Sequence, residues 1–489
     1  MTARGVVAAG HPATAAAGAQ LLRDGGNAVD AAVAAVLTSF VAEPLLTGLG
    51  AGGYLLVVPP GGDPVLLDFF VEAPGRGLDP ADHAPLRAVT VDFGDATQVF
   101  HAGGASCGTY GTPAGLAAAA AQFGRAPLHE LTAPAARLAR TGVRVLPMQA
   151  YLYALLGEIN ALTPAGRARY LPGGAPPREG DLVADPELAE ALDRFGADGP
   201  APFYTGDVAA AVVAEVRAQG GLLGAADLAA YEVVRRDPHH VPFRDVTVCT
   251  NPPPSAGGVL VGRALVELDR ACGPPDVPAL VAAMAAAERE RTPEFLAGLT
   301  GAACAAANRL GSTTHVSVLD ADGWACAVTC SNGEGSGVVV PGTGVHLNNV
   351  LGEEDLSPLG FHTQPPGTRL PSMMAPTVVL RDGAAQLVVG SAGSNRIRSA
   401  LLQVIVNVVD RGMAAQQAVD APRVHYAPEG LYAEPELPAS ELAATGLPLL
   451  PFRDRNLFFG GCQAVARDPA TGELTGGADP RRGGGVAVA

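Results

Sequence analysis

The stretch that most constrains the fold is residues 311–332, where two runs rich in β-branched residues flank Asp322-Gly323. An Asp-Gly pair between such runs is a strong signal for a tight β-hairpin. Closing the hairpin at this turn brings Thr313 beside residues 330–332, to within a residue or two of register. Because a small Gly311-Ser312 linker precedes it, Thr313 is expected at the mouth of a strand pair, opposite hydroxyl and amide side chains.

The position of Thr313 suggests a particular chemistry. A threonine hydroxyl is a weak nucleophile until a neighbouring base takes its proton, and a free N-terminal amine is one such base. The pKa of an α-amine, about 8, is already close to working pH. The linker therefore predicts that the chain is cut between Ser312 and Thr313, and that Thr313 then uses its own amine as the base. An ordinary threonine-rich hairpin has the same sequence pattern, so this stretch alone leaves both interpretations open.

Composition excludes several classes of partner. The formal net charge of −16 disfavours nucleic acids and anionic membranes. The seven cysteines are scattered, odd in number and form no CxxC pair, so neither a disulfide framework nor a zinc site is expected, and a reducing, cytoplasmic compartment fits best. No apolar run reaches the length of about 18 residues that a membrane span needs, and the apolar start of the chain is too short for a signal peptide. We expect no metal and no cofactor.

Helical and glycine-rich segments precede the hairpin. Residues 12–40 are predicted to form two alanine-rich helices, with Asn27 as the N-cap of the second and Asp30 in its first turn. Further helices are expected within residues 113–145, 186–231 and 278–308. Residues 48–53 match GxGxxG, but a dinucleotide-binding loop must open a helix, whereas this one opens the apolar strand 54–58, so a nucleotide cofactor is excluded.

A second loop has catalytic potential. A hairpin is expected over residues 375–389, and it runs through Gly390-Ser391-Ala392-Gly393-Ser394 into a helix from Asn395 to about Asp410. A small-residue loop that opens a helix presents free N–H groups at the positive end of the helix dipole. Such groups hold the oxyanion during acyl transfer. A simple turn with Ser394 or Asn395 as N-cap has the same sequence, so this loop is also open to two interpretations.

The order and spacing of several motifs resemble the γ-glutamyltranspeptidase family, from about Gly5 to Arg481. The matching motifs are His11-Pro12 and residues 25–32, 203–206, 252–258, 313–317, 347–349, 371–377 and 390–397. The resemblance implies an α+β, four-layer αββα fold of the N-terminal-nucleophile hydrolases. It also implies that one chain cuts itself into a large subunit, residues 1–312, and a small subunit, residues 313–489, which together form one domain. The match starts too early to leave room for the signal peptide of secreted relatives.

The resemblance assigns catalytic roles to four residues. Thr313 matches the nucleophile and new N-terminus. Ser331 falls, after a gap, near the hydroxyl residue that hydrogen-bonds this nucleophile. Gly393 and Ser394 match the pair whose backbone N–H groups form the oxyanion hole. The pair is usually Gly-Gly, and the backbone donors survive the change to serine.

The resemblance also assigns substrate-binding roles. Asn332 matches a substrate-positioning asparagine, and Glu353 matches an acid that binds the α-ammonium of the glutamyl group. Ser372 matches one of two serines that hold the α-carboxylate.

Two positions depart from the family pattern. Phe70 stands where the family has an arginine that clamps the glutamyl carboxylate, and Met373 replaces the second serine. An arginine clamp on a carboxylate is among the stronger polar contacts, so its replacement by an apolar ring disfavours a carboxylate by about 2 kcal/mol or more. Arg76 and Arg369 are near in sequence and are candidates to replace it.

Three functions follow. The first is a self-cleaving γ-glutamyltransferase-like enzyme that hydrolyses or transfers an acyl group, γ-glutamyl or related, from a small-molecule amide to water or an amine through a threonine acyl-enzyme. The second is an acylase or carbon–carbon hydrolase of the same fold that acts on a non-glutamyl substrate. The third is an uncleaved, catalytically inactive relative that only binds.

Overall fold

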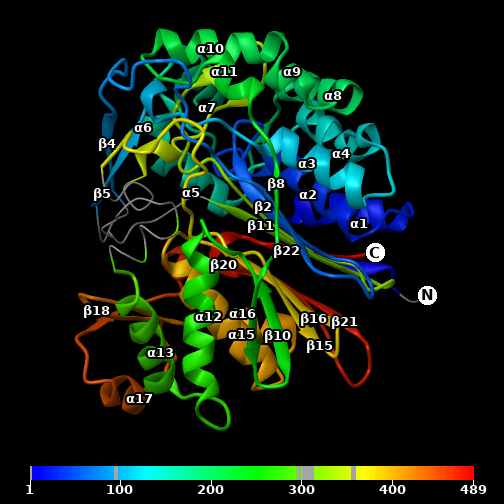
Figure 1. The fold of residues 1–489 in the computed structure, drawn as a ribbon, viewed down its shortest axis with the longest axis vertical. Helices are drawn as coiled ribbons and strands as arrows, with labels where there is room; N and C mark the ends of the chain where they lie inside the picture. The colour runs from blue at the N-terminus through cyan, green and yellow to red at the C-terminus, as the bar shows by residue number, and fades with distance from the viewer. Residues whose placement is uncertain (1–2, 93–96, 293–294, 296–298, 300–312, 354–359) are drawn as a thin grey trace.

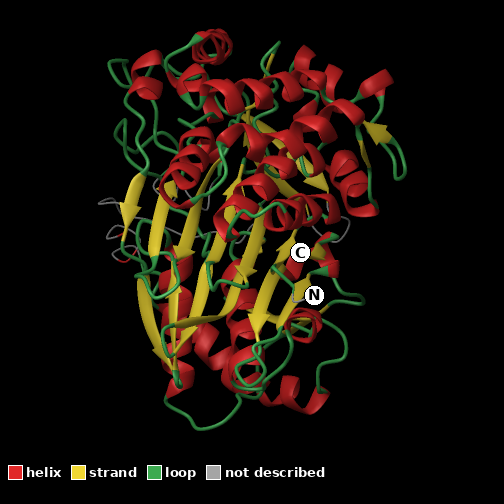
Figure 2. Cartoon of the chain, turned by 90° about the vertical axis from the view of Figure 1, so that its right-hand side faces the viewer, coloured by secondary structure: helices red, strands yellow, loops and turns green. Residues whose placement is uncertain are grey.

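Two β-sheets stacked face to face form the centre of the molecule, and helices cover both outer faces (Figures 1 and 2). The computed structural model describes residues 3–92, 97–292, 295, 299, 313–353 and 360–489. Within these ranges the four layers confirm the expected α+β, αββα arrangement.

The first sheet contains the predicted hairpin at its centre. Its strands, in spatial order, are β22 (Gly485–Val488), β1 (Gly5–Ala9), β11 (Thr314–Asp320), β12 (Ala325–Ser331), β2 (Gly52–Val58), β3 (Val65–Phe69) and β8 (Val234–Arg236). Strands β11 and β12 pair antiparallel from Thr314 with Cys330 to Leu319 with Ala325, which confirms the predicted register. Strand β2 pairs with β12, so residues 48–53 open a strand, as expected from the sequence.

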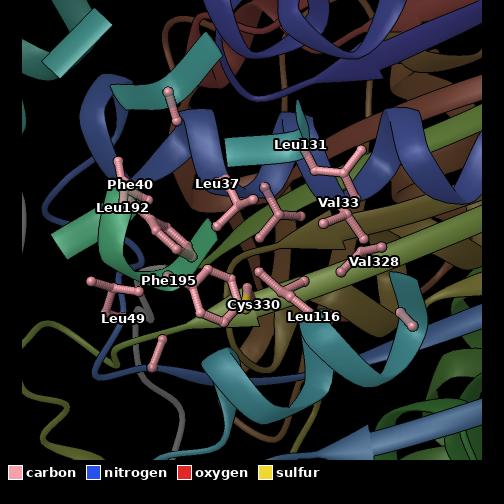
Figure 3. Packing of buried hydrophobic residues seen from close by; sticks show 14 of the residues in the cluster. Val33, Leu37, Phe40, Leu49, Leu116, Leu131, Leu192, Phe195, Val328 and Cys330 are labelled. Atoms are coloured by element: carbon pink, nitrogen blue, oxygen red, sulfur yellow. The ribbon is translucent and has the colours of Figure 1, made fainter. Parts of the chain in front are cut away.

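Helices bury the outer face of this sheet. They include α1 (Pro12–Arg23), α2 (Ala28–Ala42), α3 (Thr112–Phe123), α4 (Leu128–Thr141) and α8 (Pro186–Asp198). Helix α2 is buried along its whole length, and Val33, Leu37 and Phe40 pack in the cluster shown in Figure 3. Its predicted cap is confirmed, because the Asn27 side chain accepts from the N–H of Asp30 while the Asp30 carboxylate accepts from the N–H of Asn27.

The second sheet forms the other inner layer. Its strands, in spatial order, are β21 (Leu474–Ala478), β20 (Gly461–Arg467), β16 (Ala384–Ala392), β15 (Thr377–Arg381), β10 (Val246–Thr250) and β9 (His239–Phe243). Its outer face is covered by α12 (Ala256–Asp269), α13 (Val277–Arg289), α15 (Arg396–Val409) and α16 (Ala415–Asp420). The predicted 375–389 hairpin and the helix that follows it are both confirmed.

The remaining helices and strands surround the two sheets. The helices are α5 (Pro147–Leu155), α6 (Gly157–Asn160), α7 (Pro164–Tyr170), α9 (Ala201–Tyr204), α10 (Asp207–Ala218), α11 (Ala225–Ala229) and α17 (Ala439–Ala444). The strands are β4 (Arg87–Asp92), β5 (Thr97–Ala102), β6 (Val143–Arg144), β7 (Leu182–Val183), β13 (Val339–Val340), β14 (Val345–His346), β17 (Val424–Ala427), β18 (Gly430–Ala433) and β19 (Leu449–Pro451). Among the described residues, no helix has both the length and the apolar character needed to cross a bilayer.

Side-chain alternation divides β11 between two environments. Val316 and Val318 pack toward the helices, whereas His315 and Ser317 face the second sheet, because successive strand residues point to opposite faces. The Ser317 hydroxyl donates to the carbonyl of Gln463 on β20 at 2.9 Å. The His315 ring lies so close to Gly390 on β16 that no side chain fits there. The space between the sheets therefore holds a buried polar layer next to its apolar core.

Gly390→Ala tests this close approach. A Cβ at residue 390 would overlap the His315 ring, so we expect a loss of about 1–3 kcal/mol in the free energy of unfolding, measured as a lower midpoint of thermal unfolding. Gly157→Ala is the control, because a Cβ there meets nothing within 4 Å. Equal midpoints for the two variants would contradict the packing described.

Candidate active site

Thr313 and Ser331 face each other at the end of the central hairpin. The Thr313 hydroxyl donates to Ser331 Oγ over 3.3 Å, and Ser331 Oγ also accepts from the N–H of Gly333 at 2.9 Å. Both side chains are buried. The hairpin register produces this pair, since Thr313 directly precedes the Thr314–Cys330 pair. Ser312 and the rest of residues 300–312, which include the bond predicted to be cut, lie outside the described residues.

Asn332 adds an amide with unused hydrogen-bonding capacity. Its backbone is fixed, because its N–H donates to Leu46 and its carbonyl accepts from the N–H of Asn349, both at 3.0 Å. Its side chain is fully buried, yet neither the amide nitrogen nor the amide oxygen has a partner among the described residues. Buried polar groups are usually paired, so this amide is suited to bind a polar group of a ligand.

Glu353 lies beside the same segment. Its Oε1 atom would be 2.5 Å from a Cβ placed on Gly333, which has a positive φ of 67°. Glu353 is half-exposed. The structure thus brings together Thr313, Ser331, Asn332 and Glu353, four of the residues that the sequence singled out.

Phe70 lies in the same cross-strand row as the threonine. Ser331 on β12 pairs with Gly52 on β2. Strand β2 also pairs with β3, where Gly53 lies opposite Phe69, so the preceding residue Gly52 lies against the backbone of Phe70. Three strand spacings separate Phe70 from Thr313, roughly 14 Å in total. The Phe70 ring is buried and stacks on Tyr54 with 5.5 Å between ring centroids.

The arginines near Phe70 are already engaged. The buried Arg369 guanidinium donates to the carbonyls of Phe70 and Glu232 and forms ion pairs with Asp68 at 3.5 Å and Glu72 at 3.4 Å. Its centre lies 4.8 Å from the Tyr231 ring. Arg76 pairs with Glu72 at 3.4 Å and with Asp227 at 3.8 Å. These contacts give no support to the suggestion that either arginine replaces the missing clamp.

Ser372 and Met373 differ in environment. The Ser372 oxygen accepts from the N–H of Met374 at 2.9 Å, which leaves its O–H available as a donor. The backbone of this segment is held at α12, because Ser255 Oγ donates to the carbonyls of Ser372 and Met374. Met373 packs in the hydrophobic core under α12, so its side chain belongs to a layer other than that of Phe70.

The loop after β16 has an unusual backbone. Gly393 has a φ of 122° and Ser394 a φ of 50°, and their carbonyls accept from the N–H groups of Arg396 and Ile397 at the start of α15. Gly393 lies close to Gly460 and to the guanidinium of Arg482.

The charge of Arg482 also lowers the pKa of Glu43, whose carboxylate accepts a hydrogen bond from Thr314. Arg482 therefore lies near both Gly393, in the loop after β16, and Glu43, the hydrogen-bond partner of Thr314.

Glu43 is a site residue that sequence reasoning missed. It follows α2, and its two carboxyl oxygens accept from Thr314 at 2.8 Å and from Thr14 at 3.1 Å. Burial raises its pKa from 4.5 to about 7, and the two hydroxyl hydrogen bonds lower it by less. Gly10 allows this close approach, because a Cβ there would overlap the carboxylate. The available sequence signal was an acidic residue directly after a largely apolar helix.

His315, although two residues from Thr313, is fully committed to the sheet. Its Nδ1 pairs with Thr329 Oγ1 at 2.8 Å and its Nε2 with Ser317 Oγ at 2.9 Å. Burial lowers its pKa to about 3, so the ring is neutral near pH 7. Because both nitrogens are occupied, His315 is not a free base for the Thr313 hydroxyl. In the described part of the chain, no three His, Cys, Asp or Glu side chains gather as a metal site.

Comparison with known proteins decides the family. The family model described as Gamma-glutamyltranspeptidase matches residues 14–292 and 284–489. The chain belongs to the γ-glutamyltranspeptidase family. It is accordingly a hydrolase or acyltransferase enzyme.

The similar proteins include acylases as well as glutathione hydrolases. The Acylase ACY 1 proenzyme of Pseudomonas sp. (strain SE83) is 32% identical, over 97% of this chain and 92% of its own. The Glutathione hydrolase proenzyme of Escherichia coli (strain K12) is 31% identical, over 98% of this chain and 90% of its own. The cephalosporin acylase of Bacillus halodurans has a similar structure, with a TM-score of 0.84, 26% identity and coverage of 99% of this chain and 96% of its own.

The raised pKa of Glu43 predicts a pH dependence of stability. Between pH 4.5 and about 7 the carboxyl ionises in the unfolded chain but stays protonated in the folded one. The free energy of unfolding therefore falls as pH rises through this window, by up to about 3 kcal/mol. Glu43→Gln, which does not titrate, should remove this component. Parallel profiles of unfolding midpoint against pH for the two proteins would contradict the assignment.

Proposed function

We propose that this protein is a self-cleaving acyl amide hydrolase or transferase, and that Thr313 is its nucleophile. The observation that carries the proposal is the buried Thr313–Ser331 hydroxyl pair, with the orphan amide of Asn332 beside it. We infer that cleavage before Thr313 divides the chain into a large subunit, 1–312, and a small one, 313–489. The membership of the family, whose relatives include proenzymes, supports this inference.

The proposed chemistry uses Thr313 twice. In self-cleavage, Thr313 Oγ attacks the carbonyl carbon of Ser312, the C–N bond breaks to give an ester and a free α-amine, and water hydrolyses the ester. In turnover, Oγ attacks the substrate carbonyl while the α-amine takes its proton. The proton then passes to the leaving amine as the substrate C–N bond breaks. Water or a second amine finally releases the acyl group.

The remaining residues have separate roles. Ser331 orients the Thr313 hydroxyl, and the backbone N–H groups of Gly393 and Ser394 stabilise the oxyanion. Asn332, Ser372 and Glu353 bind polar groups of the substrate. His315 contributes by fixing β11, since both of its nitrogens are paired within the protein.

The acyl group is proposed to lack the carboxylate that an arginine would bind. Phe70 presents a buried aromatic ring at this position, and Arg369 and Arg76 are both paired with acids. An unpaired carboxylate next to an apolar ring would lose its hydration without compensation. This favours an acylase function, and acylases are among the similar proteins.

A γ-glutamyl donor is the second candidate. Glu353 beside Gly333 is placed to bind an ammonium group, and Ser372 retains a hydroxyl donor. A glutathione hydrolase is also among the relatives.

For the compartment, we propose the cytoplasm, because the six cysteines of the described ranges form no disulfide and five of them are buried.

Thr313→Ala should remain a single chain on a denaturing gel, whereas the wild type should give two bands, because only a hydroxyl at this position can attack the preceding carbonyl. Thr313→Ser keeps a hydroxyl and should still be cut. N-terminal sequencing of the smaller band should start at Thr313. Cleavage of the alanine variant at the same bond would contradict the assignment of Thr313 as the nucleophile. An uncut wild type would indicate a catalytically inactive protein of this family that only binds its ligand.

Phe70→Arg tests the acyl group. A restored guanidinium should lower KM for a γ-glutamyl anilide by about tenfold or more, as recovered binding energy does. Phe70→Leu is the neutral control and should not lower it. Self-cleavage of each variant shows that it has folded. If the wild type already turns over this anilide with a KM below about 1 mM, the proposed loss of carboxylate recognition is wrong.

A further inference from the structure

Arg482 is a half-buried arginine next to the loop that we propose to hold the oxyanion. Its Nη2 atom lies 3.5 Å from the position that a Cβ on Gly393 would take. A Cβ on Gly461, which pairs with Ala392 at the end of β16, would overlap the aliphatic part of the Arg482 side chain. The absence of a side chain at Gly461 therefore leaves the space in which the guanidinium reaches the loop.

Among the described residues, no acid forms an ion pair with Arg482. Its Nε–H is buried and has no hydrogen-bond partner there, and its Nη2 makes one long contact of 3.5 Å with the carbonyl of Leu457. Burial lowers the pKa of Arg482 to about 10, so the guanidinium still carries its charge near pH 7. A cation in such surroundings attracts any negative charge that forms beside it.

Two acids act on Arg482 at longer range, Asp479 and Glu43. Asp479 already forms ion pairs with Arg423 at 2.8 Å and with Arg481 at 3.2 Å. Burial raises the pKa of Glu43 to about 7, so below this pH its carboxyl is mostly protonated. The positive charge of Arg482 therefore acts on the loop with little compensation.

The segment that carries Arg482 also packs near the start of β11. A Cβ on Gly484, two residues after Arg482, would lie 3.0 Å from the carbonyl of Ala9. A Cβ on the residue after Ala9, Gly10, would lie 2.9 Å from Thr314 Oγ1. Arg482 is thus held between the loop after β16 and the strand that directly follows the proposed nucleophile.

We propose that Arg482 is a positioning residue of the oxyanion loop, and that its positive charge stabilises the negative oxygen formed when Thr313 Oγ bonds to the substrate carbonyl carbon. The inference rests on the proposed function, because it needs Thr313 as the nucleophile and the N–H groups of Gly393 and Ser394 as the oxyanion hole.

The charge changes during one step of the reaction. As the Oγ–C bond forms, the π electrons of the carbonyl move to its oxygen, and the proton of the Thr313 hydroxyl passes to the α-amine. A cation already fixed near that oxygen favours the anionic intermediate over the neutral carbonyl of the bound substrate. Arg482 should therefore act on kcat and not on the binding of an uncharged substrate.

Arg482→Met tests this role, because it keeps much of the side-chain length and removes the charge. We expect kcat for phenylacetyl anilide to fall by about tenfold, while KM for this neutral amide stays within about twofold. Arg482→Gln is a second neutral variant and should act as Arg482→Met does. Arg482→Lys restores the charge and should keep kcat within about threefold of the wild type.

Controls separate the local charge from other effects. Arg137→Met removes an exposed arginine charge on α4 and should change neither kcat nor KM. All proteins are assayed in the cut form, and equal midpoints of thermal unfolding show that they are folded. Measuring kcat across pH distinguishes a lower plateau, expected from a weaker oxyanion hole, from a shifted midpoint, expected from a changed pKa of the α-amine.

The outcomes separate the two proposals. The inference is overturned if the wild type is cut and active but the neutral variants keep its kcat, or if Arg482→Lys loses as much as they do. A shifted pH midpoint without a lower plateau also overturns it. A rise in KM confined to a γ-glutamyl anilide would overturn it too, because Arg482 would then bind a substrate carboxylate. If the wild type stays uncut or hydrolyses neither anilide, the proposed function itself fails.

Discussion

The antiparallel pairing of β11 with β12 is the interaction on which the candidate site depends. Its register places Thr314 opposite Cys330, and Thr313 therefore opposite Ser331. A slip of one residue would turn Thr313 to the other face of the sheet. The register is fixed from both sides, because Val316 and Val318 are buried against the helices while Ser317 hydrogen-bonds to the second sheet. Burial of both faces thus specifies the position of one hydroxyl.

The polar layer between the sheets shows how the site is held in place. The His315 ring hydrogen-bonds to Thr329 and to Ser317, and the Ser317 hydroxyl donates in turn to the carbonyl of Gln463 on β20. Such networks are stabilising only when every member is paired. Gly390 is required in the facing strand, because the His315 ring fills the space of a side chain. The orphan amide of Asn332 differs from this saturated layer, and this contrast is the reason we propose it as a ligand-binding group.

The charged groups around Phe70 pair with one another. Asp68, at the end of β3, pairs with Arg236 at 2.8 Å and with Arg369, and Glu72 pairs with Arg369 and Arg76. These acids compensate the buried guanidinium of Arg369, which also donates to the backbone of Phe70. The arginine therefore supports the backbone of Phe70, whose buried ring packs within an apolar cluster between the sheets.

The sequence alone determined the local features. The Asp-Gly turn, the alternation of β-branched residues and the Asn27 capping box each depend on neighbours within a few residues, so their patterns could be read directly. The family motifs added the four-layer fold and most of the candidate site residues.

Tertiary structure decided the contacts between distant segments. These are the carboxylate of Glu43 on Thr314, the pairing of Arg369 with Asp68 and Glu72, the core position of Met373, and the approach of Arg482 to Gly393. None has a sequence signature. Burial and charge pairing depend on which residues the folded chain brings together, and that is fixed only when the two sheets and their helices pack.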